Sequence, residues 1–286
     1  MSASTLAHQR VPVAAIRMLG TARAEWRRLG EQTRFYGKVL GSIADVVIHY
    51  RAELLRQIAG MSAGTGSLAV IGGTVAVMAF LTMSTSGVLS SQGYNQLSEV
   101  GVDAVTGFVS AFASTRLVTP GTAAFAFAAT IGAGTTAQLG AMRINEEIDA
   151  LEVMGIRSIA YLASTRVAAG VIVAVPLFCV ALLLGYTSGQ FVTTALYGQS
   201  SGVYGHYFST FFIPADAVRS FIVTLAQVTS IMLVHTYYGF TASGGPAGVG
   251  EAVGRATRAS LIVSAFVIML VTLALYGQTG NFNFAG

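Results

Sequence analysis

The sequence predicts an all-α integral membrane protein, on three observations. Of the 286 residues, 53% are apolar and only 10% are charged, whereas soluble domains average about 25% charged residues. Long stretches carry no charged residue; they lie between Arg56 and Glu99, Arg116 and Arg143, Arg166 and Asp216, Arg219 and Glu251, and after Arg258. Each is longer than the roughly 20 residues that a helix needs to cross about 30 Å of hydrocarbon. We therefore expect about five transmembrane helices, preceded by an N-terminal interfacial amphipathic helix.

The N-terminal part divides into two segments. Residues 1–34 are cationic and have no compact apolar core followed by a cleavage site, so we expect a retained cytoplasmic segment and not a signal peptide. In residues 35–62, apolar residues recur every three or four positions: Tyr36, Leu40, Ile43, Val47, Tyr50, Leu54, Ile58 and Met61. Charges fill the other face, which favours an amphipathic helix lying in the membrane interface. A soluble helix packed on a partner is the alternative.

Residues 63–286 form the predicted membrane domain. We place its spans at about Ser67–Leu89, Thr119–Met142, Val167–Ser188, Ser220–Phe240 and Ser260–Tyr276. The second span is rich in Ala and Gly, which let membrane helices approach closely. Whether residues 105–118 lengthen this span or form a separate hairpin is open at this stage.

The distribution of cations predicts the orientation, because short cytoplasmic loops carry the excess of Lys and Arg. Most of the 16 cations precede the first span or lie near residues 143–166 and 255–258. The segment 92–103, the polar loop 198–214 and the tail after Tyr276 have none. We expect a multi-pass protein of the cell inner or plasma membrane, with its N-terminus cytoplasmic and its C-terminus extracytoplasmic.

An acidic segment between the second and third spans carries the strongest functional signal. Residues 144–156 predict a short cytoplasmic helix with acids in its first turns, where they favour the helix dipole, and Gly155 at its end. Ile148, Leu151 and Met154 fall near one another at helical spacing and offer apolar anchors for a groove on a soluble partner. A solvated loop helix without a partner fits the spacing equally well.

The sequence gives little support for catalysis, a metal site or nucleic-acid binding. No histidine lies near the acidic segment, and the spans show no nucleophile or His/Asp/Glu cluster. His235 is expected to be a hydrogen-bonded packing residue. The cations are not interleaved with stacking aromatics, so no nucleic-acid partner is expected. The glycine-rich residues 244–250 lack the Lys-Ser/Thr of a phosphate-binding loop and predict a tight turn.

Two motifs resemble a known family. Residues 132–143 read GAGTTAQLGAMR and residues 146–156 read EEIDALEVMGI; together they resemble the MlaE/YrbE permeases, the membrane subunits of ABC lipid transporters that work with MCE proteins. The likeness extends from about Phe35 to the C-terminus and includes QGY at 92–94 and GGP at 244–246. The motifs NFNF at 281–284 and YGHYF at 204–208 look most like the B-type YrbE subunit of actinobacterial Mce importers, with the sterol-importing branch nearest.

The resemblance implies a set of partners and roles. It implies a heterodimer with an A-type YrbE permease, a cytoplasmic ABC ATPase dimer that binds ATP and Mg, and an MCE hexamer that forms a lipid tunnel, so no cofactor is expected in this chain. The acidic segment becomes the coupling helix, with ATPase-docking residues Glu146, Glu147, Asp149, Leu151, Glu152 and Gly155. Candidate lipid-path or outer-edge residues are Gln92, Tyr94 and Arg116. Enterobacterial relatives carry a glutamate after the corresponding arginine, where this chain has Leu117, so a role for that acid does not transfer.

These observations predict a non-catalytic permease subunit of an ATP-driven Mce-type importer of a sterol or fatty acid. The nearly charge-free spans suit an apolar or amphipathic substrate, with energy supplied from outside the membrane. Apolar walls alone do not separate one lipid from another, because transfer energies depend mainly on buried area. The alternatives are an intramembrane lipid-modifying enzyme and a scaffold for a cell-envelope complex.

Overall fold

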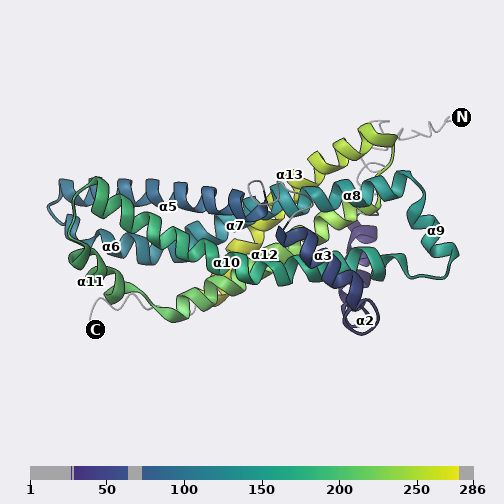
Figure 1. The fold of residues 1–286 in the computed structure, drawn as a ribbon, viewed down its shortest axis with the longest axis horizontal. Helices are drawn as coiled ribbons and strands as arrows, with labels where there is room; N and C mark the ends of the chain where they lie inside the picture. The colour runs from purple at the N-terminus through teal and green to yellow at the C-terminus, as the bar shows by residue number, and fades with distance from the viewer. Residues whose placement is uncertain (1–26, 28, 64–72, 277–286) are drawn as a thin grey trace, which may run out of the picture.

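The computed structural model describes residues 27, 29–63 and 73–276, and within them it forms helices and turns without any strand. Five of its helices are long and apolar enough to cross a membrane: Thr74–Glu99, Asp103–Ile144, Ile159–Leu196, Pro214–Phe240 and Gly245–Tyr276. This confirms the predicted class and number of spans. Figure 1 shows them packed into an elongated bundle, with α9 at one end of the long axis and α11 at the other.

Residues 105–118 do not form a separate hairpin but belong to the second span, which begins at Asp103. The span is built from η1 (Asp103–Val105), α6 (Thr106–Val109), η2 (Ser110–Val118), α7 (Thr119–Phe127), η3 (Ala128–Gly132) and α8 (Ala133–Ile144). It has 42 residues without a break, which corresponds to about 63 Å at 1.5 Å per residue. Because the hydrocarbon core is about 30 Å thick, this helix extends well beyond it.

The other spans are also longer than predicted. α5 covers Thr74–Glu99, and the predicted start at Ser67 lies outside the described residues. The third span joins η4 (Ile159–Ser164), α10 (Thr165–Phe191) and η5 (Val192–Leu196). α12 covers Pro214–Phe240, and α13 covers Gly245–Tyr276. The fifth span was predicted too short because Arg255 and Arg258 were assigned to the loop before it. Both lie within α13, and Arg255 pairs with Glu251 across one helical turn at 2.8 Å.

The predicted loop 198–214 is largely helical. α11 covers Ser201–Phe211 and carries an aromatic face that packs on the second and third spans. The rings of Phe208 and Tyr186 meet edge to face at 5.0 Å. Its backbone comes so close to Gly107 that a Cβ there would lie 2.5 Å from the Tyr204 carbonyl oxygen. α11 therefore closes its end of the bundle as an aromatic cap.

The prediction of one continuous amphipathic helix over residues 35–62 is wrong, because the segment is divided into several helices. The chain forms a helix over 29–41, then α2 (Ile43–His49) and α3 (Arg51–Ala63), with breaks at Ser42 and Tyr50. These breaks shift the register of the apolar stripe. The apolar residues buried against the bundle are Phe35, Val39, Val46 and Leu54, whereas Leu40 and Val47 of the predicted stripe are exposed.

The core combines close backbone approach with paired hydroxyl groups. Its largest cluster centres on Phe127 of α7 and on Ile231 and Met232 of α12, all fully buried. Along α5, hydroxyls meet those of the second span at four-residue intervals: Thr82 with Thr122 at 2.9 Å, Ser86 with Ser114 at 3.3 Å, and Ser90 with Ser110 at 2.9 Å. Small residues and interhelical hydrogen bonds hold membrane helices together where no hydrophobic effect does so.

His235 has a packing environment that sequence reasoning anticipated. It is fully buried, with its Nδ1 2.7 Å from Thr136 Oγ1 and its Nε2 3.1 Å from Ser260 Oγ. The ring lies against Gly132, where a Cβ would come within 2.6 Å of it. The histidine therefore joins α8, α12 and α13 at one crossing.

Candidate functional site

The acidic segment folds as a separate short helix, α9 (Glu147–Val153), shorter than the predicted 144–156. Glu146 adopts a left-handed conformation (φ 61°), which separates α9 from α8. At the other end the N–H groups of Gly155 and Ile156 donate to the carbonyls of Glu152 and Leu151, both at 3.0 Å. This is a Schellman motif, and Gly155 supplies its positive φ of 77°. α9 is thus fixed by a turn at each end.

The apolar residues of α9 face in two directions. Ile148 is fully buried and packs with Leu139 and Leu162, and Leu151 packs partly against the same cluster. The predicted grouping of Ile148 with Met154 as partner anchors is therefore wrong: Ile148 holds α9 onto the bundle. The apolar side chains that α9 presents outward are Val153, 90% exposed, and Met154, 66% exposed. The spacing argument did not identify Val153 as an exposed apolar residue, although its position just before the end of the helix could be read from the sequence.

The acidic residues of this segment also divide into two groups. Asp149 forms an ion pair with Arg143 at 2.6 Å, and Glu152 accepts a hydrogen bond from Ser158 Oγ at 2.5 Å. Glu146 and Glu147 are exposed. Asp149 and Glu152 thus bond to neighbouring side chains while remaining exposed, and Glu146 and Glu147 are exposed at the start of α9, the end opposite Val153 and Met154.

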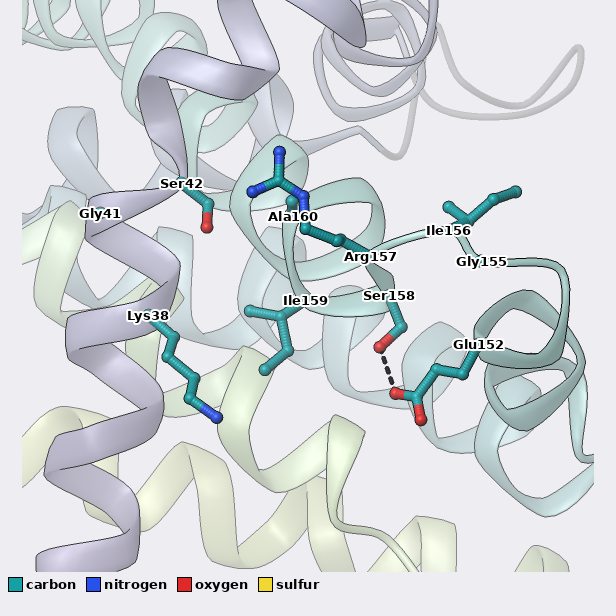
Figure 2. Close-up of a pocket in the computed structure, with 10 residues that line it drawn as sticks. All are labelled: Lys38, Gly41, Ser42, Glu152, Gly155, Ile156, Arg157, Ser158, Ile159 and Ala160. Atoms are coloured by element: carbon teal, nitrogen blue, oxygen red, sulfur yellow. Dashed lines mark hydrogen bonds between the residues drawn. The ribbon is translucent and has the colours of Figure 1, made fainter.

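A cavity of about 570 Å³ opens beside α9, between the end of helix 29–41 and residues 152–160. Its lining includes Glu152 and Gly155 of the predicted site, and also Lys38, Arg157 and Ile159. Figure 2 shows Ile159 between the side chains of Lys38 and Arg157, with the Ser158–Glu152 hydrogen bond at one side. The sequence did not predict this hollow, because it depends on how residues 29–41 pack on the third span.

The segment after α9 is tied to the N-terminal helices. Arg157 forms an ion pair with Asp45 of α2 at 3.0 Å, and the hydrogen bond from this pair raises the pKa of the Arg157 guanidinium above its usual value. Deeper in the bundle, Ser164 Oγ donates to the Val39 carbonyl at 2.9 Å. These contacts fix one wall of the cavity to the other.

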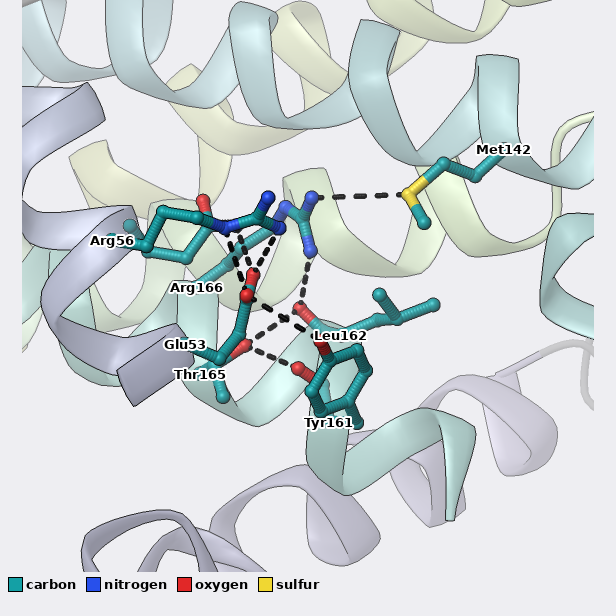
Figure 3. A network of polar contacts seen from close by, with 8 residues as sticks. Glu53, Arg56, Met142, Tyr161, Leu162, Thr165 and Arg166 are labelled. Atoms are coloured by element: carbon teal, nitrogen blue, oxygen red, sulfur yellow. Dashed lines mark hydrogen bonds and ion pairs between the residues drawn. The ribbon is translucent and has the colours of Figure 1, made fainter. Parts of the chain in front are cut away.

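A polar network centred on the buried Glu53 lies next to these contacts (Figure 3). Glu53 of α3 accepts hydrogen bonds from Arg56 at 2.9 Å and Gln57 at 2.6 Å, and Tyr161 of η4 donates to it at 3.5 Å. Burial acts to raise the pKa of Glu53, but the hydrogen bonds from Arg56 and Gln57 outweigh it and hold the pKa below its usual range. Arg166, also buried, donates to the Leu162 carbonyl at 3.0 Å. The network joins α3 to the start of the third span.

The three candidate lipid-path residues do not form one site. Gln92 lines a groove between α5 and η5, and the Tyr94 ring packs on that of Tyr197 with centroids 4.5 Å apart. Arg116 instead belongs to a cluster on the second span, where its Nε lies 2.8 Å from Asp216 Oδ2. Arg219 binds the other carboxylate oxygen at 2.9 Å.

Aromatic rings surround the Arg116 cluster. The Arg116 guanidinium lies 4.3 Å from the Phe112 ring centre and 4.7 Å from that of Tyr276. Asp216 is buried, so the two arginines neutralise a carboxylate that would otherwise be costly to bury. Sequence reasoning missed Asp216, which is 100 residues from Arg116. Leu117, next to Arg116, is exposed and lines a separate apolar cavity of about 360 Å³ with Leu81 and Phe125.

Comparison with known proteins decides the family. The family model described as Permease MlaE matches residues 65–274. The chain belongs to the MlaE permease family. A probable ABC transporter permease protein of Rickettsia bellii is 26% identical over 194 residues, covering 68% of this chain and 73% of that protein. One from Rickettsia felis is 24% identical over 243 residues, covering 85% and 92%.

A plant relative extends the comparison. The chloroplastic protein TRIGALACTOSYLDIACYLGLYCEROL 1 of Arabidopsis thaliana is 26% identical over 226 residues, covering 79% of this chain and 62% of that protein. The chain is therefore an ABC transporter permease of the MlaE family and a multi-pass membrane protein. Such permeases are the non-catalytic membrane subunits of lipid transporters.

Proposed function

We propose that this chain is the permease subunit of an ATP-driven Mce-type lipid importer, and that α9 is its contact with a cytoplasmic ATPase. The observation that carries this proposal is the division of α9 into two faces. Ile148 anchors it to the bundle, while Val153 and Met154 are exposed together with Glu146 and Glu147. An exposed apolar pair rimmed by charge is typical of a surface that a partner protein covers.

The orientation required by this proposal agrees with the charge distribution. Arg143 and Arg157 flank α9, and Lys38 lines the neighbouring cavity. The opposite end, around α11, contains no lysine or arginine between residues 197 and 214. By the positive-inside rule the α9 end is cytoplasmic, with the N-terminus on that side and the C-terminus outside.

The proposed complex has further subunits. An A-type YrbE permease would complete the lipid path, and an MCE hexamer would meet the opposite end. α13 offers an apolar face to the first of these, with Ile262, Phe266, Met269 and Leu273 all exposed. The lipid, a sterol or a fatty acid, would pass along the groove that includes Gln92. Support for these partners comes from the sequence motifs and from family membership.

The ATPase contact is tested by co-purification. Val153→Asp and Glu147→Lys are each introduced into the full complex, and the amount of ATPase that co-purifies with the permease is measured. Both side chains are exposed, so the variants should insert normally while ATPase recovery falls by about tenfold, equivalent to roughly 1.4 kcal/mol. Glu99→Lys makes the same charge change at the far end of α5 and should leave recovery unchanged. Unchanged recovery in both α9 variants would reject α9 as the docking element.

Measuring both the uptake and the chemical state of a labelled lipid distinguishes a transporter from a lipid-modifying enzyme and from a scaffold. Labelled lipid taken up by cells with and without the chain is extracted and its mass determined. Loss of uptake with chemically unchanged lipid supports transport. Chain-dependent modification of the lipid would instead indicate an enzyme, and uptake that does not depend on the chain would indicate a scaffold.

A further inference from the structure

Arg166 of the third span is a buried cation without a counter-ion. Only 4% of its surface is exposed. Its Nη1 donates to the Leu162 carbonyl at 3.0 Å, its Nη2 lies 3.9 Å from the Met142 sulfur, and its Nε has no partner. Among the described residues no carboxylate forms an ion pair with it. A guanidinium has five N–H donors, so most of its bonding capacity is unused, and a buried charge without a partner is costly.

Glu53 of α3 is the acid that faces this cation. Figure 3 shows the guanidinium groups of Arg56 and Arg166 directed toward the same region, beside the Glu53 carboxylate. Burial acts first to raise the pKa of Glu53, and the charge of Arg166 lowers it together with the hydrogen bonds from Arg56 and Gln57. Arg166 therefore acts on Glu53 electrostatically without being bound to it.

The carboxylate is bound instead by an arginine that has less need of it. Arg56 contacts both oxygens of Glu53 at 2.9 Å, but the Arg56 side chain is 73% exposed. Water already solvates its charge, and exposed arginines gain little from an ion pair. Transfer of the carboxylate to Arg166 would neutralise a buried charge and release Arg56 to water. Two arginines thus compete for one acid, and the buried one gains more from it.

Few directional contacts fix α3 against the third span. Among the described residues, the only hydrogen bond between them runs from Tyr161 Oη to Glu53 at 3.5 Å, which is longer than is usual for a hydroxyl donor. Leu54 shares a small apolar cluster with Ala169, whose short side chain does little to hold the register. A cavity of about 220 Å³, lined by Gln57 and by residues of the second span, lies beside α3. α3 therefore has both the freedom and the space for a small shift.

We propose that Glu53 exchanges Arg56 for Arg166 as its ion-pair partner when the start of the third span moves against α3, and that Arg166 is the positioning residue of this second state. The inference rests on the proposed function, because an ATPase acting on α9 would supply the movement. Only residues 154–158 separate α9 from η4, so a displacement of α9 reaches the first turns of the third span directly. Because the carboxylate binds one arginine or the other, the exchange gives this movement two discrete states.

Spin-label distance measurements in the full complex test this exchange. One nitroxide is attached to Cys179, the single cysteine of the chain and an exposed one, and the other to Leu55→Cys on the exposed side of α3. The other subunits carry no reactive cysteine. One main distance is expected without nucleotide, and a second should appear when the complex is trapped with a non-hydrolysable ATP analogue. Arg56→Gln should raise the ratio of the second to the first population at least about tenfold without nucleotide, because it removes the charged hydrogen bonds of the first state.

Two further variants make the result specific. Arg166→Gln should abolish the second distance in the trapped complex and leave the first unchanged, whereas a merely structural role would broaden both. Arg255→Gln, which breaks an exposed ion pair on α13, is the matched control and should change neither distance. If Arg166→Gln does not assemble, the effect of Arg56→Gln decides.

Two results would overturn the exchange. They are a single distance in every nucleotide state that Arg56→Gln does not alter, and a second distance that persists in Arg166→Gln. Either result in a complex that still imports labelled lipid would leave the proposed function intact. Lipid uptake that does not need the chain would overturn the proposed function itself.

Discussion

Asp45 of α2 and Arg157 of the segment after α9 form an ion pair at 3.0 Å, although they lie far apart in sequence. With the Ser164–Val39 hydrogen bond and the Glu53 network, this pair attaches the segment after α9 to the N-terminal helices. A force applied to α9 therefore reaches both the third span and the N-terminal helices. Substitutions that remove one of these contacts should therefore weaken the attachment of the N-terminal helices to the segment after α9.

Glu53→Gln should destabilise the protein at neutral pH and not at low pH. The folded-state pKa of Glu53 lies below its usual value, so its carboxylate contributes stability above the unfolded-state pKa, and this contribution is lost as pH falls through the folded pKa. The loss at pH 7 should be about 1.5–3 kcal/mol, as for hydrogen bonds to a charged group. Thermal unfolding in detergent at pH 7 and at about pH 3, well below the ordinary pKa of a glutamate, measures it. A deficit of equal size at both pH values would contradict the ionic role.

Glu146→Gly should stabilise the turn between α8 and α9. Glu146 is the only non-glycine residue with positive φ in the described part of the chain, at 61°, and glycine adopts this conformation without the steric cost of a Cβ. The gain should be about 1 kcal/mol, seen as a higher unfolding temperature. Asn145→Gly is the control, because its φ of −89° gives glycine no such advantage. A lower unfolding temperature for Glu146→Gly would show that the carboxylate itself stabilises the turn.

Gly132→Ala should disturb the helix crossing at His235. The added Cβ would lie 2.6 Å from the imidazole ring, and backbone or ring must move to admit it. We expect a cost of about 1–3 kcal/mol, typical of overpacking. Gly121→Ala in the same span is the matched control, since a Cβ there meets nothing within 4 Å. Unfolding temperatures and detergent-extracted yield compare the two, and equal values would show that the crossing is looser than its geometry indicates.

Asp216→Asn should be strongly destabilising, because it leaves Arg116 and Arg219 without their shared carboxylate. Removing one partner of a buried ion pair costs about 3–5 kcal/mol. The double variant Asp216→Asn with Arg219→Gln should recover part of this loss by removing one of the unpaired charges. Thermal unfolding of the single and double variants gives the comparison. A double variant less stable than the single one would show that Arg219 acts through the Tyr276 ring and not through Asp216.

The sequence was sufficient to predict the class of fold and the number of spans, because apolar stretches of more than about 20 residues without a charge are rare outside membrane helices. It could not predict where the helices end. Arg255 and Arg258 indicated a loop, yet both lie in α13, where Arg255 pairs with Glu251 across one helical turn. Short π-helical stretches such as η2 and η3 leave no signal in hydropathy, since they depend on a shift in backbone hydrogen bonding.

The short helix α9 was predictable from the sequence, whereas the direction in which each of its side chains points was not. The acidic motif marked α9, but spacing alone could not show that Ile148 has Leu139 and Leu162 as neighbours, and so faces inward. In the same way Arg116 was visible as an isolated cation, whereas Asp216 could be assigned to it only after the helices were placed side by side. Pairwise contacts between distant segments are the information that one sequence does not carry.

The helix from Asp103 to Ile144 is unbroken and runs along the bundle, so a movement at one of its ends can be transmitted to the other. One end adjoins the turn into α9, and Arg116 lies in the π-helical stretch η2 toward the other. If a partner protein tilted α9, the connected helix would tilt with it, because no loop interrupts the helix between its two ends. The π-helical stretches η2 and η3, with Pro120 between them, are places where this helix can bend, so they would limit how much of a movement at one end reaches the other.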